Sequence, residues 1–374
     1  MDPLSEGLPG ADERAEAEAL LLLQRVLGLG DRSVRALVEG FGSGRAALAA
    51  GDRDAAAAIG RGEEGRRAVR ARGGRPDRDA VAASLAAADA LAMRVVPMTS
   101  PRYPARLLEL SDPPPVLFLR GRSELLLPPA VAIVGSRRAT AYGRRVAARL
   151  AAALAREGVV VVSGLALGVD GAAHRGALDA GGPTVAVLGT GADAAHPPAH
   201  AGIFRRIAQE GLLVSEFPPG TPALAHHFPR RNRIMAALAR VVVVVEAAAR
   251  SGALITARHA LDLGRDVLAV PGPIDADTSA GTNALLRDGA QPMLGPDDVL
   301  RALGIEAAGR APVAPPRGTD LATLWDALGA APLGVDELSG RTGFSAPRAL
   351  AALSQLEVEG WAVQTAGARF ARRA

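Results

Sequence analysis

The sequence predicts an α/β protein built on an extended Rossmann-like parallel sheet, with a helical domain before the sheet and a winged-helix-like domain after it. Short runs of β-branched residues recur between residues 77 and 304, and amphipathic helical segments separate them. Strands that read as continuous apolar runs are typical of a parallel sheet covered by helices on both faces. Apolar residues make up 49% of the chain and aromatic residues only 3%, which suits close packing of helices on a sheet.

The expected strands and helices alternate along the chain. The strands are expected at 131–134, 159–162, 184–188, 212–214, 241–245 and 267–270. The helices between them are expected near 141–157, 170–180, 199–210, 230–239 and 252–263. A sheet of this kind binds its ligand at the carboxyl ends of its strands. The loops that follow the strands are therefore the expected site.

Composition divides the chain into three parts and a linker. Residues 12–72 are rich in Ala, Leu and Arg and are expected to be helical, whereas 77–304 hold nearly every strand signal. A Pro/Ala/Gly/Arg linker is expected over 305–318, before the tail 319–374. The tail resembles a winged helix, with helices expected at 319–328, 335–342 and 345–359 and a ribbon at 361–370.

Charge and composition narrow the possible classes of function. All 43 basic residues are Arg and the formal net charge is only +4, so a nucleic-acid signal must come from where the Arg lie. The absence of Cys excludes disulfides and thiolate zinc sites. No apolar run approaches the about 18–20 residues of a membrane span, and the acidic N-terminus is unlike a signal peptide. We expect a cytoplasmic protein without membrane attachment.

Glycine and serine follow four of the predicted strands. The loops begin Gly135-Ser136-Arg137-Arg138, Ser163-Gly164 through Gly168, Gly189-Thr190-Gly191, and Ser215 through Gly220. Backbone N–H groups at such strand ends, together with the dipole of the next helix, can hold an anion. In a single loop, Gly more often serves the turn alone. Four such loops, beside five Arg and no acid between 135 and 149, favour a phosphate-binding site.

Residues 226–233, His-His-Phe-Pro-Arg-Arg-Asn-Arg, form a second candidate. The segment brings together one aromatic ring, three guanidinium groups and an amide: Phe228, Arg230, Arg231, Arg233 and Asn232. Guanidinium groups can hold phosphates while a ring stacks a base. A solvated basic face is the alternative for such a run taken alone. Between 226 and 258 there are six Arg and a single acid, Glu246.

The sequence contains partial matches to catalytic and cofactor-binding motifs, but none of these motifs is complete. Residues 189–194 have the G-x-G-x-x-A form of a dinucleotide fingerprint, but Pro197 and Pro198 delay the helix until about residue 199. The six His form no metal set. Asp170 and His174 could form an acid–base pair, although a capping Asp and a locally bonded His are the commoner arrangement. We expect no catalytic residue, no metal and no cofactor.

The middle domain resembles the DNA-processing protein A (DprA/Smf) family over about residues 95–295. The stretches that carry the resemblance are VAIVGSR (131–137), SGLALGVDGAAH (163–174), LVSEFP (213–218), HFPRRNRI (227–234), SGALIT (251–256), GRDVLAVPG (264–272) and GTN (281–283). The resemblance implies a Rossmann fold without established catalytic activity that pairs as a homodimer through this domain. It also implies binding of single-stranded DNA and help in loading RecA on that DNA during natural transformation.

Carried over residue by residue, the resemblance implies DNA contacts at Arg137, Arg175, Phe228, Arg231 and Arg233. All of these except Arg175 lie in segments that the residues alone already indicate. We expect single-stranded DNA to be bound, without strong sequence preference, by Gly135, Ser136, Arg137, Arg138, Ser163, Gly164, Gly168, Arg175, Phe228, Arg230, Arg231, Asn232 and Arg233.

The terminal domains are expected to contribute little to DNA binding. Gly28-Leu29-Gly30 resembles a helix–hairpin–helix (SAM-like) domain, yet residues 11–40 carry six acids against four Arg. Helix 345–359 sets Arg348 against Glu357 and Glu359, a poor charge pattern for reading the major groove. The main alternative function is a nucleotide phosphoribohydrolase on a related fold, whose Pro-Gly-Gly-x-Gly-Thr signature is missing here.

Overall fold

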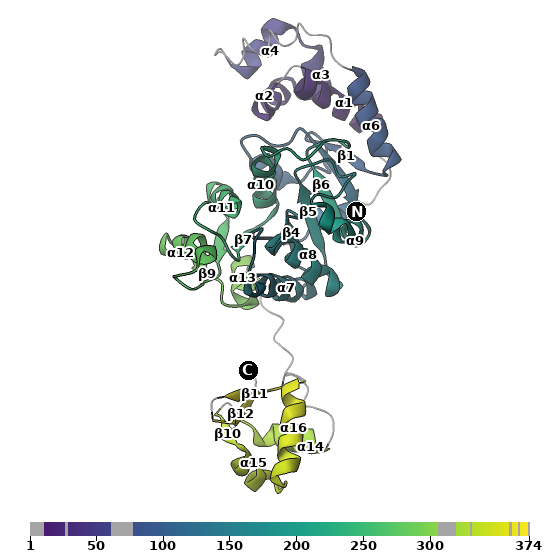
Figure 1. The fold of residues 1–374 in the computed structure, drawn as a ribbon. Coiled ribbons are helices and arrows are strands. Elements are labelled where there is room, and N and C mark those ends of the chain that lie inside the picture. The colour runs from purple at the N-terminus through teal and green to yellow at the C-terminus, as the bar shows by residue number, and fades with distance from the viewer. Residues whose placement is uncertain are drawn as a thin grey trace. The chain divides into compact units, whose positions relative to one another are not determined.

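The computed structural model describes residues 11–26, 29–60, 78–305, 319–329, 331–358, 361–365 and 367–372. The chain divides into two compact units, residues 1–307 and 308–374, and Figure 1 labels their helices and strands. The helices before residue 60 belong to the same unit as the sheet. The predicted linker, 305–318, lies outside the described residues except for Ile305.

A nine-stranded sheet forms the centre of the first unit, in the order β1-β2-β6-β5-β4-β3-β7-β8-β9. Its parallel strands are β3 (Ala130–Val134), β4 (Val160–Ser163), β5 (Thr184–Leu188), β6 (Leu212–Ser215), β7 (Val241–Val244), β8 (Asp266–Ala269) and β9 (Gln291–Pro292). β1 (Arg94–Pro97) and β2 (Val116–Gly121) extend the β6 edge as antiparallel strands. The predicted fold class is confirmed, and β1, β2 and β9 are additional strands.

The order of the strands reverses beside β3. The chain passes from β3 to β4, β5 and β6 in one direction and then returns to place β7 on the other side of β3. Val131 to Val134 pair in register with Val241 to Val244. An α/β sheet opens a crevice at such a switch point, outside the carboxyl ends of the two strands. The topology therefore directs attention to the loops after β3 and β7.

Helices cover both faces of the sheet. They are α7 (Ala141–Arg156), α8 (Val169–Asp179), α9 (Ala201–Glu210), α10 (His227–Leu238), α11 (Gly252–Asp262), α12 (Ala280–Arg287) and α13 (Pro296–Leu303). Alternate residues of β3 point to opposite faces, so Val131 and Ile133 share a core with α7, α8 and α13 (Figure 1). Ala132 and Val134 share the other core with α10 and α11. Thr140 starts α7 by accepting a hydrogen bond from the Gly143 N–H at 3.1 Å.

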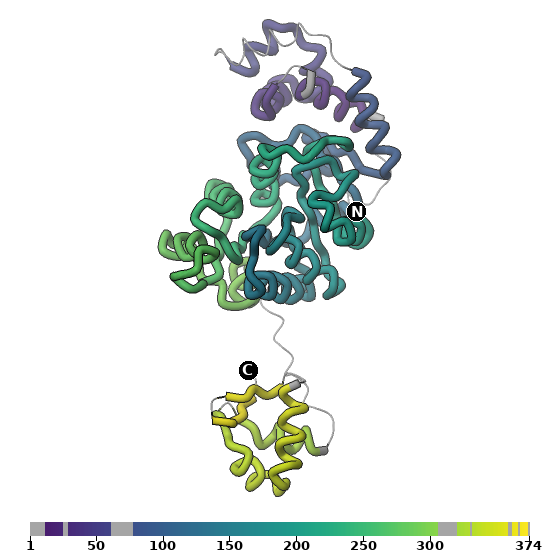
Figure 2. The backbone as a smooth tube through the Cα atoms, in the orientation of Figure 1, coloured from purple at the N-terminus to yellow at the C-terminus, as the bar shows by residue number. Residues whose placement is uncertain are grey.

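The N-terminal helices are α1 (Ala11–Val26), α2 (Asp31–Phe41), α3 (Gly44–Ala49), α4 (Asp52–Ile59) and α6 (Arg78–Ala90). Among them, α1 and α6 pack on the antiparallel edge of the sheet, and α2 and α3 pack on α1 (Figure 2). The Leu20 to Leu23 side chains are buried in the core that includes β1 and β2. Arg102 pairs with Glu13 of α1 at 2.7 Å. The helical segment is therefore fastened by both apolar packing and ion pairs.

The second unit has the predicted winged-helix composition. It contains α14 (Thr319–Ala327), α15 (Val335–Thr342) and α16 (Ala346–Val358), with the strands β10 (Leu333–Gly334), β11 (Ala362–Thr365) and β12 (Arg369–Arg372) in the order β10-β12-β11. Leu324, Leu338, Leu353 and Phe370 form its own core. Arg348 of α16 pairs with Asp320 at 2.7 Å. Within the described ranges of the whole chain, the helices fall short of the length and apolarity that crossing a bilayer requires.

Candidate functional site

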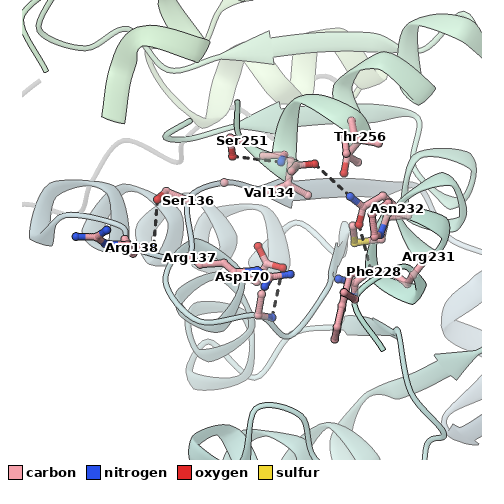
Figure 3. Close-up of a pocket in the computed structure, with 18 of the residues that line it drawn as sticks. Val134, Ser136, Arg137, Arg138, Asp170, Phe228, Arg231, Asn232, Ser251 and Thr256 are labelled. Carbon is pink, nitrogen blue, oxygen red and sulfur yellow. Dashed lines mark hydrogen bonds between the residues drawn. The ribbon is translucent and has the colours of Figure 1, made fainter. Parts of the chain in front are cut away.

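A cavity of about 670 Å³ opens at the carboxyl ends of β3 and β7. Its walls come from the loop after β3, the first turns of α10, the loop after β7 and the start of α11 (Figure 3). Its polar lining consists of Ser136, Arg137, Arg138, Asp170, His196, Arg231, Asn232, Ser251 and Thr256. The cavity therefore lies where the strand order reverses, as expected for a ligand site of this fold.

The loop after β3 presents two guanidinium groups to solvent. Its backbone is fixed because the Ser136 N–H donates to the Glu246 carbonyl at 2.7 Å and the Ser136 hydroxyl accepts from the Arg138 N–H at 3.1 Å. Arg137 and Arg138 are exposed. Within the described part of the chain, neither guanidinium lies within ion-pair distance of a carboxylate. The loop thus holds two positive charges that are free to meet an anion.

Gly168 packs closely against the backbone of this loop. Its φ of +78° lies in the left-handed region that favours glycine. A Cβ at this position would collide with the carbonyl oxygen of Ser136. Gly168 does not line the cavity, so the structure assigns it a role in shaping the loop rather than a direct contact with a ligand.

Phe228, on the first turn of α10, is half-buried at the cavity wall. The Arg137 guanidinium lies 5.2 Å from the centre of its ring, within the range of a cation–π contact. The His196 ring is centred 5.5 Å from it, at 34°. A Cβ on Gly189 would lie 2.9 Å from the ring, so the glycine after β5 makes room for it. A ring beside exposed guanidinium groups can stack a planar group such as a base, while the guanidinium groups hold the phosphate attached to it.

Arg231 lies in the cavity wall but is only 3% exposed. It donates to the Gly164 carbonyl at 2.7 Å and also to the Val187 carbonyl. The pKa of Arg231 is lowered to about 10, chiefly by burial, with the negative charge of Asp170 raising it and the positive charge of Arg137 lowering it. At neutral pH the guanidinium is still protonated. Arg231 therefore gives the cavity a fixed positive charge that bridges the ends of β4 and β5.

The expected anion-binding role of the other three loops needs correction. The Gly164 N–H donates to the Asp170 carboxylate at 3.1 Å, and the Ser163 hydroxyl donates to the Ile133 carbonyl at 2.7 Å. The Gly191 N–H donates to the Thr221 carbonyl at 3.1 Å, and the Ser215 hydroxyl to the Thr190 carbonyl. Internal partners therefore occupy these groups, and of the residues in the three loops the cavity contacts Ala166 alone.

Asp170 and His174 do not form an acid–base pair. Asp170 accepts from the N–H groups of Gly164 and Ala166, so it braces the loop before α8 rather than capping the helix. Burial raises the pKa of Asp170. His174 Nδ1 lies 2.7 Å from the Thr184 hydroxyl, and burial lowers its pKa to about 3. Across the described residues, no three His, Asp or Glu side chains form a group suited to a metal ion.

Arg230 and Arg233 depart from the expectation for the arginine-rich segment. Arg233 is only 3% exposed, and its Nη2 donates to Glu216 at 2.7 Å and to Asp31 at 3.0 Å. Arg230 bonds the same two carboxylates at 2.9 and 2.6 Å. Neither residue lines the cavity, and neither does the exposed Arg175 of α8. A direct DNA contact is therefore not supported for Arg230 and Arg233, because they neutralise buried carboxylates.

The loop after β7 and the start of α11 also line the cavity, although none of their residues was expected at the site. The Ser251 hydroxyl caps α11 by accepting from the Ala253 N–H at 3.3 Å. Asn232 donates to the Gly252 carbonyl at 3.2 Å, and the buried Thr256 hydroxyl beside them has no partner. The usable signal was the one applied to the other loops: a Ser-Gly pair shortly after an apolar strand, at the same edge of the sheet.

Comparisons with known proteins agree with this geometry. The family model for DNA recombination-mediator protein A matches residues 94–304, and that for the DprA winged helix domain matches residues 307–368. A putative DNA processing protein DprA from Mycobacterium tuberculosis is 44% identical over 282 residues, 71% of this chain and 72% of that protein.

Two solved structures are similar to this fold. The X-ray structure of DNA processing protein A from Streptococcus pneumoniae gives a TM-score of 0.68 at 34% identity, covering 76% of this chain and 97% of that one. A structure of the Helicobacter pylori protein, which addresses its single-stranded-DNA-binding mode, gives a TM-score of 0.50 at 35% identity and covers 54% of this chain and 92% of that one.

Proposed function

The chain belongs to the DNA recombination-mediator protein A family, and we propose that it binds single-stranded DNA at the cavity between the loops after β3 and β7. One observation carries the proposal: two exposed guanidinium groups without a carboxylate partner lie beside a half-buried ring at the switch point of the sheet. The single-stranded-DNA binding of the Helicobacter pylori relative supports the same assignment.

Each side chain has a distinct part in the proposed complex. Arg137 leaves the Phe228 ring and grips a phosphate with its two-pronged guanidinium. The ring then stacks a base, which every base can do because each has a π-face. Arg231 stays in place and supplies a fixed positive charge at the wall. Contacts to phosphates and ring faces carry little sequence information, so binding is without strong sequence preference.

We also propose the partners and the biological role that family membership supports. Two copies pair through the α/β unit, and the bound DNA is passed to RecA during natural transformation and recombination. The protein does this without catalysis, because His174 and Asp170 are both held by internal hydrogen bonds. A nucleotide phosphoribohydrolase activity is the alternative. An assay for phosphate or base released from nucleoside monophosphates separates the two, and turnover would favour the enzyme.

The direct test of the site is Arg137→Ala in the full chain. We expect single-stranded-DNA affinity to fall at least about tenfold, or about 1.4 kcal/mol, with an unchanged melting temperature. The slope of log affinity against log salt becomes shallower by about 0.7, the value for one phosphate contact on a single strand. Arg206→Ala is the matched control, because Arg206 is a surface Arg already paired with Asp179 and Glu210. Unchanged affinity of Arg137→Ala, or a flat salt response of the wild type, contradicts the proposal.

A further inference from the structure

We propose that Asp31, from the N-terminal helices, is a positioning residue for the helix α10 that carries half of the DNA site. The inference rests on the proposed function, because α10 matters for binding only if the cavity takes DNA. It starts from one juxtaposition: the Asp31 carboxylate is bonded to two arginines that lie on the same helix as Phe228 and Arg231.

The side chains of helix α10 form two sets, one that lines the cavity and one that bonds carboxylates outside it. Phe228, Arg231, Asn232 and Met235 line the cavity, whereas Arg230 and Arg233 bond carboxylates outside it. Spacings of three and four residues place the first set on one side of a helix, because a turn takes 3.6 residues. A displacement of the arginines on the other side therefore moves the cavity wall. The bonds of Arg230 and Arg233 therefore contribute to the position of α10, beside the apolar contacts of the helix.

The buried carboxylates of this cluster match its two arginines in number only when the N-terminal helices contribute Asp31. Glu216, whose side chain is 1% exposed, accepts from both arginines. A single carboxylate cannot neutralise two guanidinium groups, and Asp31 supplies the second buried negative charge. Asp112 reaches Arg233 at 3.4 Å but is 38% exposed. Because Arg233 is 3% exposed, loss of the Asp31 charge leaves a buried cation short of a partner.

Asp31 is itself held in place. The Gln24 amide donates to its second carboxylate oxygen at 2.7 Å. Asp31 is the first residue of α2, where the positive end of the helix dipole favours a carboxylate. Arg35, one turn further along α2, bonds the carbonyls of Leu108 and Leu110. The same helix therefore offers one side chain that bonds α10 directly and one that bonds the segment beside it.

The test compares Asp31→Asn with Arg35→Ala in the full chain. Hydrogen exchange is measured without DNA, and single-stranded-DNA affinity is then measured over a range of salt. We expect Asp31→Asn to raise exchange within residues 227–238 about tenfold or more, with exchange in α7 unchanged. We expect affinity to fall about three- to thirtyfold, with the salt slope unchanged because Asp31 contacts no phosphate. Arg35→Ala leaves the exchange of α10 and the affinity as in the wild type.

Several outcomes overturn the inference. Unchanged hydrogen exchange of α10 in Asp31→Asn overturns it. An equal rise in exchange in Arg35→Ala also overturns it, because the position of α10 would then depend on docking of the N-terminal helices as a whole and not on Asp31. Tighter binding with a steeper salt slope would mean that Asp31 merely masks Arg230. If Asp31→Asn does not fold, Gln24→Leu keeps every charge and is expected to shift α10 exchange in the same direction, by less. If Arg137→Ala leaves DNA affinity unchanged, the proposed function fails, whatever α10 does.

Discussion

Arg137 and Arg233 both belong to runs of the sequence that are rich in Arg and poor in acid, but the structure uses them in opposite ways. Arg137 is exposed and its guanidinium lies against the Phe228 ring. Arg233, like its neighbour Arg230, is bonded to Asp31 and Glu216. The counter-charge of the second run comes from residues that are distant in sequence, 202 positions away in the case of Asp31. Local charge patterning therefore detects a basic segment but does not decide whether the segment meets DNA or the protein interior.

The largest expected effect is the loss of folding stability when the buried Arg233 is replaced. Arg233→Ala removes the more deeply buried of the two arginines that the carboxylates of Asp31 and Glu216 share, so we expect the free energy of unfolding to fall by about 3–5 kcal/mol. Arg137→Ala, at an exposed position, changes it by no more than about 0.5 kcal/mol. Urea denaturation of both variants measures the difference. The comparison is wrong if Arg233→Ala is as stable as the wild type and loses only DNA affinity.

A fall in pH is expected to affect the stability of the protein interior and the DNA affinity of the exposed loop differently. The Thr184 hydroxyl donates to the Val161 carbonyl and so accepts from His174 Nδ1–H, while His174 Nε2 has no partner. The folded-state pKa of His174, about 3, lies below the usual 6.5. Between these values the unfolded chain binds the extra proton, so the contribution of His174 to stability is full above about pH 6.5 and falls by about 2 kcal/mol on reaching pH 5.

Denaturation at pH 7 and pH 5 measures this loss, and His174→Leu is expected to remove most of it. DNA affinity is expected to stay constant over the same range, because His174 does not line the cavity. A loss of affinity that His174→Leu prevents would mean that DNA binding depends on this interior residue.

Phe228→Ala separates stacking from charge within the exposed site. If the ring stacks a base, affinity falls by about 1–3 kcal/mol and the salt slope is unchanged, because no phosphate contact is lost. The ring is half-buried, so a melting curve accompanies the titration. A drop in melting temperature large enough to account for the lost affinity would make Phe228 a core residue instead.

The smallest expected effect concerns the two units of the chain. The single Arg of α16 is already paired with Asp320, so we expect a chain that ends at residue 307 to bind single-stranded DNA within about twofold of the full chain, or about 0.4 kcal/mol. A gel-shift titration of both chains decides this. Loss of binding on truncation, with Arg137→Ala still active, would move the site to the second unit.

Much of the fold could be predicted because its signals are local. The strands β3 to β8 begin and end within one residue of the predicted positions, since runs of Val and Leu define buried parallel strands. β1 and β2 were missed because only a short 3-10 helix (Ala105–Glu109) separates them, so the alternation of strands and α-helices does not extend to them. In the site, the exposed loop after β3 was predictable from its position. The ion cluster of Arg233 was not, because it depends on tertiary contacts that have no local pattern.

Because Gly164 and Arg231 are in contact, substitutions at these two positions depend on each other. Any side chain at residue 164 would occupy the space of the guanidinium, so a substitution there displaces Arg231 from the carbonyls of Gly164 and Val187 unless residue 231 becomes smaller. Shortening Arg231 alone removes the bridge between the ends of β4 and β5 and leaves a void in the cavity wall. An engineer who wants a roomier pocket for a modified base, or a neutral one for an uncharged ligand, therefore needs paired substitutions at both positions. Libraries that vary either position alone will consist mostly of misassembled sites.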